Sequence, residues 1–190
     1  MNISFDSPKG NVVIRQVELN EVYLLRQIFK LRVSCRQESK YITYDKYPNG
    51  WFDDVDFVSQ HFAAFCNEKI IAAGRISFFE NIAKHPYFPA LEKILPENLL
   101  QKPIAYLSRD QVSVDFRGLG IRNVLLNERE KLCRAKNISD LFIDVATDDS
   151  QFSNFNKDGY EEVALFDTSK IKWDVGSSIL MHKILQLNIV

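Results

Sequence analysis

The order of strand-like and helix-like segments constrains the fold of this chain more than any other feature of its sequence. β-Branched and aromatic residues gather in runs that predict strands over 11–17, 60–66, 69–79, 104–115, 140–147, 160–166 and 178–187. Apolar residues three and four positions apart predict helices over 19–33, 89–95, 120–136 and 151–157, with a further short helix and loops between 36 and 56. Because strands and helices are interleaved without a repeat or linker, we expect one domain over residues 1–190, with a mixed α/β sheet covered by helices.

Composition and charge narrow the class of protein and its compartment. The 190 residues are 46% hydrophobic and 26% charged, which is typical of a globular protein with a substantial core. A formal net charge of -1 gives no general attraction to nucleic acid or an anionic membrane, so we expect neither partner. The sequence starts without a secretory signal and has no apolar run near the ~20 residues of a membrane span, so we expect a cytoplasmic protein. Three cysteines without a CxxC pair predict free thiols and no metal site.

The stretch from Gln111 to Leu126 carries the clearest functional signal. It has the pattern of a strand, a turn and an amphipathic helix, and the turn is Arg117-Gly118-Leu119-Gly120-Ile121-Arg122. The first turn of a helix presents N–H groups and the positive end of its dipole, and glycine lets the backbone approach an anion closely. Two arginines add positive charge, so we predict that this turn holds a pyrophosphate mainly through main-chain groups. A plain strand-to-helix turn is the alternative, and the P-loop and Gly-x-Gly-x-x-Gly patterns are absent.

The residues from Val112 to Ile121 resemble motif A of the GNAT acetyltransferases, written [Arg/Gln]-x-x-Gly-x-[Gly/Ala]. Arg117 and Gly120 match it, and Arg122 stands where the motif has a small residue. The resemblance implies a mostly antiparallel sheet flanked by helices, in which two central strands splay and the pantetheine of the acyl donor lies between them. It also implies main-chain contacts to that donor from a set of loop and strand residues: Val112, Ser113, Val114, Arg117, Gly118, Leu119, Gly120, Ile121 and Arg122. Val112 or a neighbour would stabilise the oxyanion of a tetrahedral intermediate.

This resemblance implies an N-acetyltransferase as the first hypothesis. The chain would transfer an acetyl group from acetyl-CoA, or another acyl-CoA, to a primary amine of a small molecule or amino acid by direct attack. No metal is required for this chemistry. A non-catalytic module that keeps affinity for coenzyme A is a hypothesis from another class.

A second resemblance suggests a longer acyl chain. Basic and acidic residues recur in an order similar to the acyl-homoserine-lactone synthases and N-acyl amino acid synthases: Arg26, Arg32, Asp53-Asp54, Asp56, Arg75 and Ser108-Arg109. Those enzymes have a glutamate two residues before Ser-Arg, where this chain has Tyr106. The resemblance implies a donor carried by coenzyme A or by an acyl carrier protein, which would then be a partner. The aromatic stretch from Tyr41 to Phe57 would line the acyl pocket.

Proton transfer in such a reaction needs an acid for the thiolate. The GNAT family places a tyrosine four residues before the glycine that ends the last helix, and this chain has Phe155 before Gly159. The resemblance therefore leaves Asn156 and Tyr160 as substitutes, with water as the alternative, and it also implies that Asn156 contacts the cofactor.

The base is expected on the strand before the loop. Asp110 lies two residues before Val112 and so shares its strand face, with a structural ion pair as the alternative. Tyr106 has the same parity and would orient a water, and Glu80 and His61 are further candidates.

Two arginines inside apolar strand segments predict an anion. Arg75 and Arg109 would hold a substrate carboxylate, or they would form buried salt bridges with the Asp53-Asp54-Asp56 cluster. His61 is placed with them as a substrate contact, and a buried structural histidine is its alternative. The final apolar strand, 179–187, would allow a homodimer.

Overall fold

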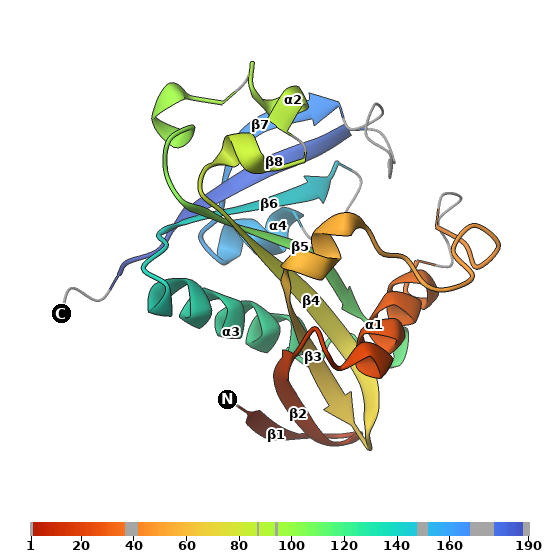
Figure 1. Cartoon of the computed structure of the whole chain (residues 1–190). Coiled ribbons are helices and arrows are strands. Elements are labelled where there is room, and N and C mark those ends of the chain that lie inside the picture. The colour runs from red at the N-terminus through yellow and green to blue at the C-terminus, as the bar shows by residue number, and fades with distance from the viewer. Residues whose placement is uncertain are drawn as a thin grey trace. The chain divides into compact units, whose positions relative to one another are not determined.

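The computed structural model describes residues 2–36, 42–86, 88–93, 95–147, 152–167 and 177–187. Its strands are β1 (Ile3–Ser7), β2 (Gly10–Val17), β3 (Gln60–Cys66), β4 (Lys69–Phe79), β5 (Ile104–Val112), β6 (Asp140–Ala146), β7 (Glu161–Asp167) and β8 (Ser177–Ile184). Its helices are α1 (Val22–Ser34), α2 (Phe88–Leu91), α3 (Ile121–Ala135) and α4 (Phe152–Lys157), and Figure 1 shows them beside the strands. Short 3₁₀ turns are η1 (Asp54–Val58), η2 (Ile82–Lys84), η3 (Glu97–Leu99) and η4 (Val114–Phe116).

The strands are hydrogen-bonded in the order β1-β2-β3-β4-β5-β6-β8-β7. Strands β1 to β4 form antiparallel neighbours, as do β6 with β8 and β8 with β7. Strands β5 and β6 are parallel, and their register joins Ile104–Leu107 to Asp140–Ile143. The predicted fold class, a mixed and mostly antiparallel sheet with flanking helices, is confirmed.

The chain divides into two compact units, each discontinuous in sequence. Unit 1 combines Met1–Ser77 with Ser108–Lys131, and unit 2 combines Phe78–Leu107 with Leu132–Val190. Strands β4 and β5 and helix α3 each contribute to both units. The expectation of one domain over residues 1–190 stays a prediction.

In unit 1, α1 covers one face of β2, β3 and β4. Its apolar stripe packs on small and branched strand residues to form a cluster: Val17, Leu25, Ile28, Phe29, Leu31, Ala63 and Ala73. Because strand side chains alternate, Gly74 belongs to the opposite face. A side chain at Gly74 would point at Arg129 of α3, so α3 lies on the face of β4 that α1 does not cover.

In unit 2, the segment between β4 and β5 folds over the sheet. Leucines and isoleucines of this segment pack on apolar and aromatic residues of the strands to form one cluster: Ile82, Leu91, Leu95, Leu99, Ile104, Tyr106, Phe142, Phe166 and Leu180. Tyr106 and Phe142 stand in the same row of β5 and β6. Because this cluster is buried and mostly apolar, a polar group within it, such as the Tyr106 hydroxyl, needs a hydrogen-bond partner.

Most predicted boundaries hold, and the differences have local causes. The hairpin predicted over 60–66 and 69–79 has those bounds, with its turn residues Asn67 and Glu68 at φ 49 and 64. Strand β1 was not predicted from the sequence. A turn joins it to β2, and in that turn Ser7 Oγ donates to the Gly10 carbonyl at 2.7 Å. The strand predicted to residue 115 ends at Val112, because residues 114–116 turn into η4.

Three helix predictions need correction or fall partly on residues that are not described. The helix predicted over 89–95 is wrong in its extent, because α2 ends at Leu91. The short helix expected between 36 and 56 overlaps η1 only at residues 54–56, and η1 is a 3₁₀ turn. Residues 37–41, with Tyr41, lie outside the described residues. Residue 151, where the last helix was predicted to start, is also outside them, and α4 begins at Phe152.

Candidate functional site

A strand end, a tight turn and a helix start form the loop that the sequence singles out, and all of it belongs to unit 1. The Ser113 amide donates to the Ile71 carbonyl of β4 at 2.8 Å, which fixes the end of β5 beside its neighbour. The chain then turns through η4, with the Phe116 amide bonded to the Ser113 carbonyl at 2.8 Å. Helix α3 begins at Ile121, directly after the turn.

Two glycines give the turn its shape. Gly118 and Gly120 have φ of 78 and 74, a left-handed conformation that other residues rarely adopt. A methyl group added to either would meet nothing within 4 Å, so the space beside both glycines is open. Strain from positive φ, and not crowding, therefore explains why glycine is required at these two positions within the structure.

The first turn of α3 follows these glycines directly and has main-chain donors that the helix itself does not use. The Gly120 carbonyl accepts from the amides of Asn123 at 3.0 Å and Val124 at 3.3 Å, so it is the first carbonyl of the helix. Main-chain amides ahead of Asn123 have no carbonyl one turn earlier in the helix to which they can donate. With the positive end of the helix dipole, this geometry suits an anion such as a pyrophosphate.

The two arginines of the loop lie differently. The Arg117 guanidinium donates to the carbonyls of Val112 at 3.3 Å and Cys35 at 3.4 Å, so it ties the loop to β5 and to the end of α1. Arg122 Nη1 donates to Asn123 Oδ1 at 3.0 Å. Arg122 also lines a small pocket with residues of β4, β5 and α3: Ala73, Asp110, Gln111, Val112, Leu125 and Arg129.

The other residues predicted to contact the donor differ in their exposure. Val114 is exposed, Ser113 and Leu119 are half-buried, and Ile121 is buried beneath the start of α3. Main-chain contacts do not require exposed side chains, so all four positions stay predictions.

A buried ion pair holds α3 against the strands. Arg129 is fully buried, and its guanidinium donates to the carbonyls of Leu125 and Arg75 at 3.1 and 3.3 Å. It also pairs with both oxygens of Asp110, at 2.6 and 3.0 Å. Asp110, the candidate base, thus faces a buried guanidinium, which fits the structural ion pair that the sequence left open. Its catalytic role stays a prediction.

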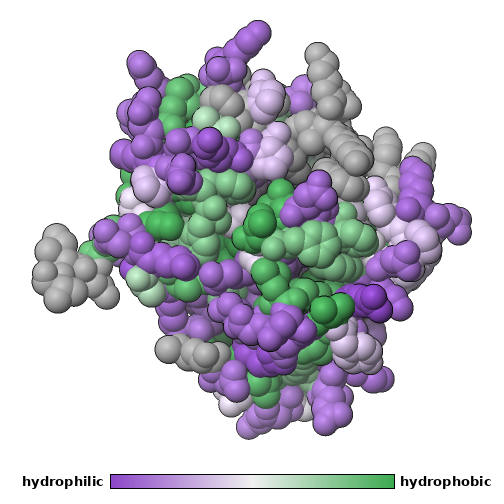
Figure 2. Space-filling view, in the orientation of Figure 1, coloured by the Kyte–Doolittle hydropathy of each residue, from purple (hydrophilic) through white to green (hydrophobic). Residues whose placement is uncertain are grey.

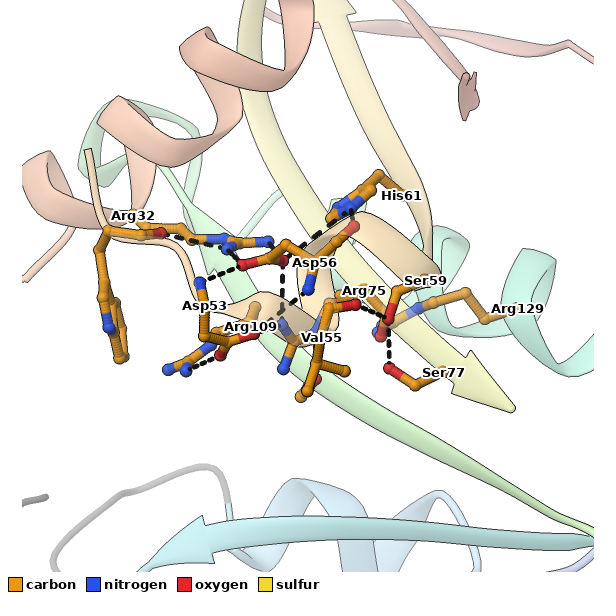
Figure 3. A network of polar contacts seen from close by, with 12 residues as sticks. Arg32, Asp53, Val55, Asp56, Ser59, His61, Arg75, Ser77, Arg109 and Arg129 are labelled. Atoms are coloured by element: carbon orange, nitrogen blue, oxygen red, sulfur yellow. Dashed lines mark hydrogen bonds and ion pairs between the residues drawn. The ribbon is translucent and has the colours of Figure 1, made fainter. Parts of the chain in front are cut away.

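Three arginines and two aspartates form a second buried network in unit 1, which Figure 3 shows between α1, η1 and the strands. Asp56 accepts two hydrogen bonds of 2.9 Å from Arg32 and lies 2.9 Å from Arg75 Nη1. Asp53 accepts from Arg75 Nη1 and from Arg109 Nη2, each at 2.6 Å. Each of these side chains is less than a tenth exposed.

Arg75 and Arg109, the two arginines predicted to contact substrate, both have partners in this network. Arg75 Nε also donates to Ser108 Oγ at 2.9 Å, and the Arg109 guanidinium lies 3.9 Å from the centre of the Trp51 ring. Arg109 has φ of 59 within β5, and this break in the strand alternation turns its side chain toward Asp53. Both arginines therefore have carboxylate partners within the chain, and a substrate carboxylate stays a prediction for them.

The charges of this network perturb one another strongly. Burial raises the pKa of Asp53, but the guanidinium groups of Arg75 and Arg109 outweigh it and hold the pKa below its ordinary value. The pKa of Asp56 lies far below its ordinary value because Arg32 and Arg75 outweigh its burial in the same way. Since three guanidinium groups face two carboxylates, the network keeps one surplus positive charge when all five groups are ionised.

His61 lies at the edge of the same network without access to solvent. Its Nε2 is 2.9 Å from the backbone oxygen of Asp56, and its ring meets the edge of Phe29. Burial lowers the pKa of His61, and the charges of Arg32 and Arg75 lower it further, so the ring is neutral near pH 7. This environment fits a buried structural histidine, and its predicted substrate contact is untested.

The remaining predicted residues belong to unit 2. Tyr160 follows α4 and is buried, with its ring 5.5 Å from that of Phe155, and Asn156 is exposed on α4. Tyr106 is buried on β5, and its hydroxyl donates to Asp144 Oδ1 on β6 at 2.9 Å. Asp144 is not singled out by the sequence, although it is the one carboxylate within the otherwise apolar run Leu141–Ala146.

Neither a cluster of metal-ligand residues nor a helix long enough for a membrane occurs in the described part of the chain. Between residues 2 and 187, with the gaps given above, there is no group of three or more His, Cys, Asp or Glu placed to hold a metal ion. No helix within the described part of the chain is long and apolar enough to cross a membrane. Figure 2 shows apolar residues at the surface between hydrophilic ones. The exposed large apolar residues of unit 1 include Val22, Tyr23, Phe57 and Val58.

The chain resembles known proteins in its structure but not detectably in its sequence. No protein-family model matches the chain, and no curated protein matches it in sequence. A GNAT-family acetyltransferase from Streptococcus pneumoniae superposes with a TM-score of 0.63 at 16% identity, over 92% of this chain and 99% of that one. Naa50 from Arabidopsis thaliana, in complex with the bisubstrate analogue CoA-Ac-MVNAL, gives 0.62 at 14% identity, over 92% and 99%.

The chain has the GNAT fold. FeeM, an N-acyl amino acid synthase from uncultured soil microbes, has the same fold, with a TM-score of 0.63 at 14% identity over 91% of this chain and 90% of that one. The fold implied by both sequence resemblances is therefore confirmed. Within this GNAT fold, the loop 117–122 joins the end of β5 to the start of α3, as motif A predicts.

Proposed function

We propose that this chain is an acyltransferase that moves an acyl group from an acyl-CoA to a primary amine. The first candidate is acetyl transfer from acetyl-CoA to a small molecule or an amino acid. A GNAT fold at 13–17% identity does not by itself name an activity, so the proposal depends on the site.

The loop at the start of α3 is the observation that carries the proposal. Gly118 and Gly120 hold left-handed conformations beside open space, and the helical turn directly after them has main-chain donors that the helix does not use. An anion with several oxygens, such as the pyrophosphate of coenzyme A, suits donors that converge from one turn. The departure at Arg122 leaves this arrangement intact, because the donors belong to the main chain.

The chemistry follows from the position of the loop in the chain. The amine nitrogen attacks the thioester carbonyl, the C–N bond forms, and the nitrogen loses a proton to a base or to solvent. The C–S bond breaks to release the thiolate, which takes a proton from solvent or an acid. Main-chain amides near Val112, at the end of β5, would stabilise the oxyanion of the intermediate. No metal takes part in these steps.

A longer acyl chain is the second candidate, with coenzyme A or an acyl carrier protein as its carrier. An aromatic group in unit 1 favours it: Phe29 stacks on Phe52 at 5.2 Å and meets Phe57 at 6.4 Å, and Phe52 and Phe57 are both partly exposed. FeeM, which shares the fold, is an N-acyl amino acid synthase. Apolar aromatic surface of this kind would suit an alkyl chain better than an acetyl group.

Turnover assays with two donors test the proposal and separate its candidates. Acetyl-CoA and octanoyl-CoA are each incubated with a panel of amino acids and aliphatic amines, and thiol release and product mass are recorded. The first candidate predicts transfer mainly from acetyl-CoA, and the second predicts transfer mainly from octanoyl-CoA. Thiol release without an acylated amine, or no release at all, contradicts the proposal.

A further inference from the structure

One residue inside a strand has a backbone conformation that strands do not normally contain. Arg109, on β5, has φ of 59, in the left-handed region where a side chain is strained. The other non-glycine residues of the described ranges with positive φ lie where this conformation is ordinary: Asn67 and Glu68 in the turn between β3 and β4, and Asn137 just beyond α3. An arginine within a strand has no such local reason, so contacts outside the strand must hold its conformation.

The side chain of Arg109 shows what holds it. Arg109 Nη2 donates to Asp53 Oδ2 at 2.6 Å, and the guanidinium lies over the Trp51 ring. Both charged side chains of this pair are 8% exposed, so water and salt screen their attraction little. Asp53 is itself fixed at the start of η1, because its Oδ1 accepts from the Asp56 amide at 3.2 Å and from Arg75 Nη1 at 2.6 Å. A carboxylate with four fixed partners thus anchors the end of the Arg109 side chain.

The chain directly after Arg109 leads into the loop at the start of α3. Asp110, the next residue, pairs with Arg129 of α3 at 2.6 Å. Three residues later, the Ser113 amide donates to the Ile71 carbonyl of β4 at 2.8 Å. All of these residues belong to unit 1. The backbone direction that is set at Arg109 therefore decides where β5 ends and from where the loop begins.

Loss of the anchor would let residue 109 return to an ordinary strand conformation. A strand residue has φ near about −120 to −140°, so a return from 59 would rotate the following chain by roughly 180° about the N–Cα bond of Arg109. A rotation of that size moves Asp110 away from Arg129, and with it the segment that carries the loop. The left-handed conformation and the position of the loop are thus linked.

We propose that Asp53 is a positioning residue of the acyl-CoA site and that it acts through Arg109. This inference rests on the proposed function. The ion pair holds Arg109 in its left-handed conformation, and that conformation places the end of β5 and the loop before α3 for the donor. Asp53 does this without touching the donor. The guanidinium of Arg109 thereby serves the backbone that carries it, whether or not it also contacts a substrate carboxylate.

Arg109→Ala and Arg109→Gly test this role, because they remove the same ion pair and differ by one methyl group. Glycine reaches positive φ without strain, whereas alanine does not. The dissociation constant of acetyl-CoA is measured for each folded variant by isothermal titration calorimetry. Arg109→Ala is expected to bind roughly 5- to 30-fold more weakly than wild type, because strain leaves only a fraction of the molecules in the binding conformation. Arg109→Gly is expected to stay within about threefold of wild type.

A second pair of variants tests the anchor itself. Asp53→Asn removes the charge and keeps a side-chain oxygen for the start of η1, and it is expected to weaken acetyl-CoA binding like Arg109→Ala. Adding Arg109→Gly to Asp53→Asn is expected to restore binding, because the left-handed conformation then needs no anchor. Asp54→Asn is the matched control at the exposed neighbour and should bind like wild type. Donor binding is the readout, and not turnover, because Arg109 is also a predicted substrate contact.

Three results would overturn the inference. The first is an Arg109→Ala variant that binds acetyl-CoA as tightly as wild type, and the second is an Arg109→Gly variant that binds as weakly as Arg109→Ala. The third is an Asp53→Asn variant whose weakened binding Arg109→Gly does not restore. In each case a wild type that binds acetyl-CoA leaves the proposed function standing. A wild type that binds neither acetyl-CoA nor octanoyl-CoA removes the proposed function and this inference together.

Discussion

Replacing Asp56 by asparagine perturbs the most heavily buried charge of the Arg–Asp network. Asp56 is 0% exposed and accepts from both terminal nitrogens of Arg32, from the Asp53 backbone amide and from Arg75. Asparagine keeps the volume but removes the charge, and it presents an N–H group toward one of these donors. Arg32, which is 1% exposed, then loses the only carboxylate with which the described structure pairs it.

The expected cost follows from the burial of both partners. Removing one partner of a buried ion pair costs about 3–5 kcal/mol, because the other charge stays buried without compensation. For a chain of this size each kcal/mol lowers the unfolding temperature by roughly 2–4 °C, so we expect a fall of about 6–20 °C. The free energy of unfolding from urea denaturation should fall by the same ~3–5 kcal/mol. This is a large share of the about 5–15 kcal/mol by which a folded protein is usually stable.

Asp54→Asn is the matched control for this measurement. Asp54 lies two residues earlier in the same turn and is exposed, so the same substitution there should change stability by less than about 0.5 kcal/mol. If Asp56→Asn also changes the free energy of unfolding by less than about 1 kcal/mol, the network does not hold unit 1 together and the reasoning is refuted.

Two further predictions concern stability. Gly74→Ala should destabilise the fold by about 1–3 kcal/mol, because its Cβ would lie 2.5 Å from Asp110 Oδ1 and 2.8 Å from Arg129 Cζ; an unchanged urea midpoint would show that the ion pair yields freely. His61 has a lowered pKa, so the unfolded chain binds more protons than the folded chain below about pH 6.5, and stability present above that pH is lost as the pH falls. Urea unfolding is measured at pH 5.5 and 7.5, both above the pH range in which carboxylates ordinarily titrate. The free energy of unfolding should be larger at pH 7.5, and equal values would contradict a buried neutral ring.

Local patterns in the sequence predict the loop because its chemistry is local. Gly118 and Gly120 lie between a strand and a helix, and their need for positive φ follows from the turn alone. The hairpin at Asn67-Glu68 is local in the same sense. Such features depend on neighbours in the chain, so one sequence suffices to predict them.

The partners of buried charges are harder to predict because they depend on long-range packing. Asp110 suggests a base when only its strand is considered, and its partner Arg129 lies 19 residues later. That arginine sits in the run Asn127-Glu128-Arg129-Glu130, which looks like an exposed helix face, yet three of these residues are buried. The helical period does not distinguish a solvated charge from one that a neighbouring element covers.

Asp144 shows the same limit within unit 2. Its hydrogen bond to Tyr106 spans 38 residues and depends on the parallel register of β5 and β6. An acidic residue inside the otherwise apolar run 141–146 was the available signal, because a buried strand seldom carries one. Register between distant strands, which sets this pair, is not encoded in any short segment.

Binding of acetyl-CoA at the loop is the central claim, and a thermal-shift titration tests it most directly. A ligand at ~100-fold over its dissociation constant adds about 2.7 kcal/mol, or roughly 5–10 °C for a chain of this size. Wild type and Gly10→Glu, a positive-φ glycine in the β1–β2 turn of the same unit, should both show this shift, whereas Gly120→Glu should show none. A shift retained in Gly120→Glu, or absent from wild type with both acetyl-CoA and octanoyl-CoA, would contradict the account.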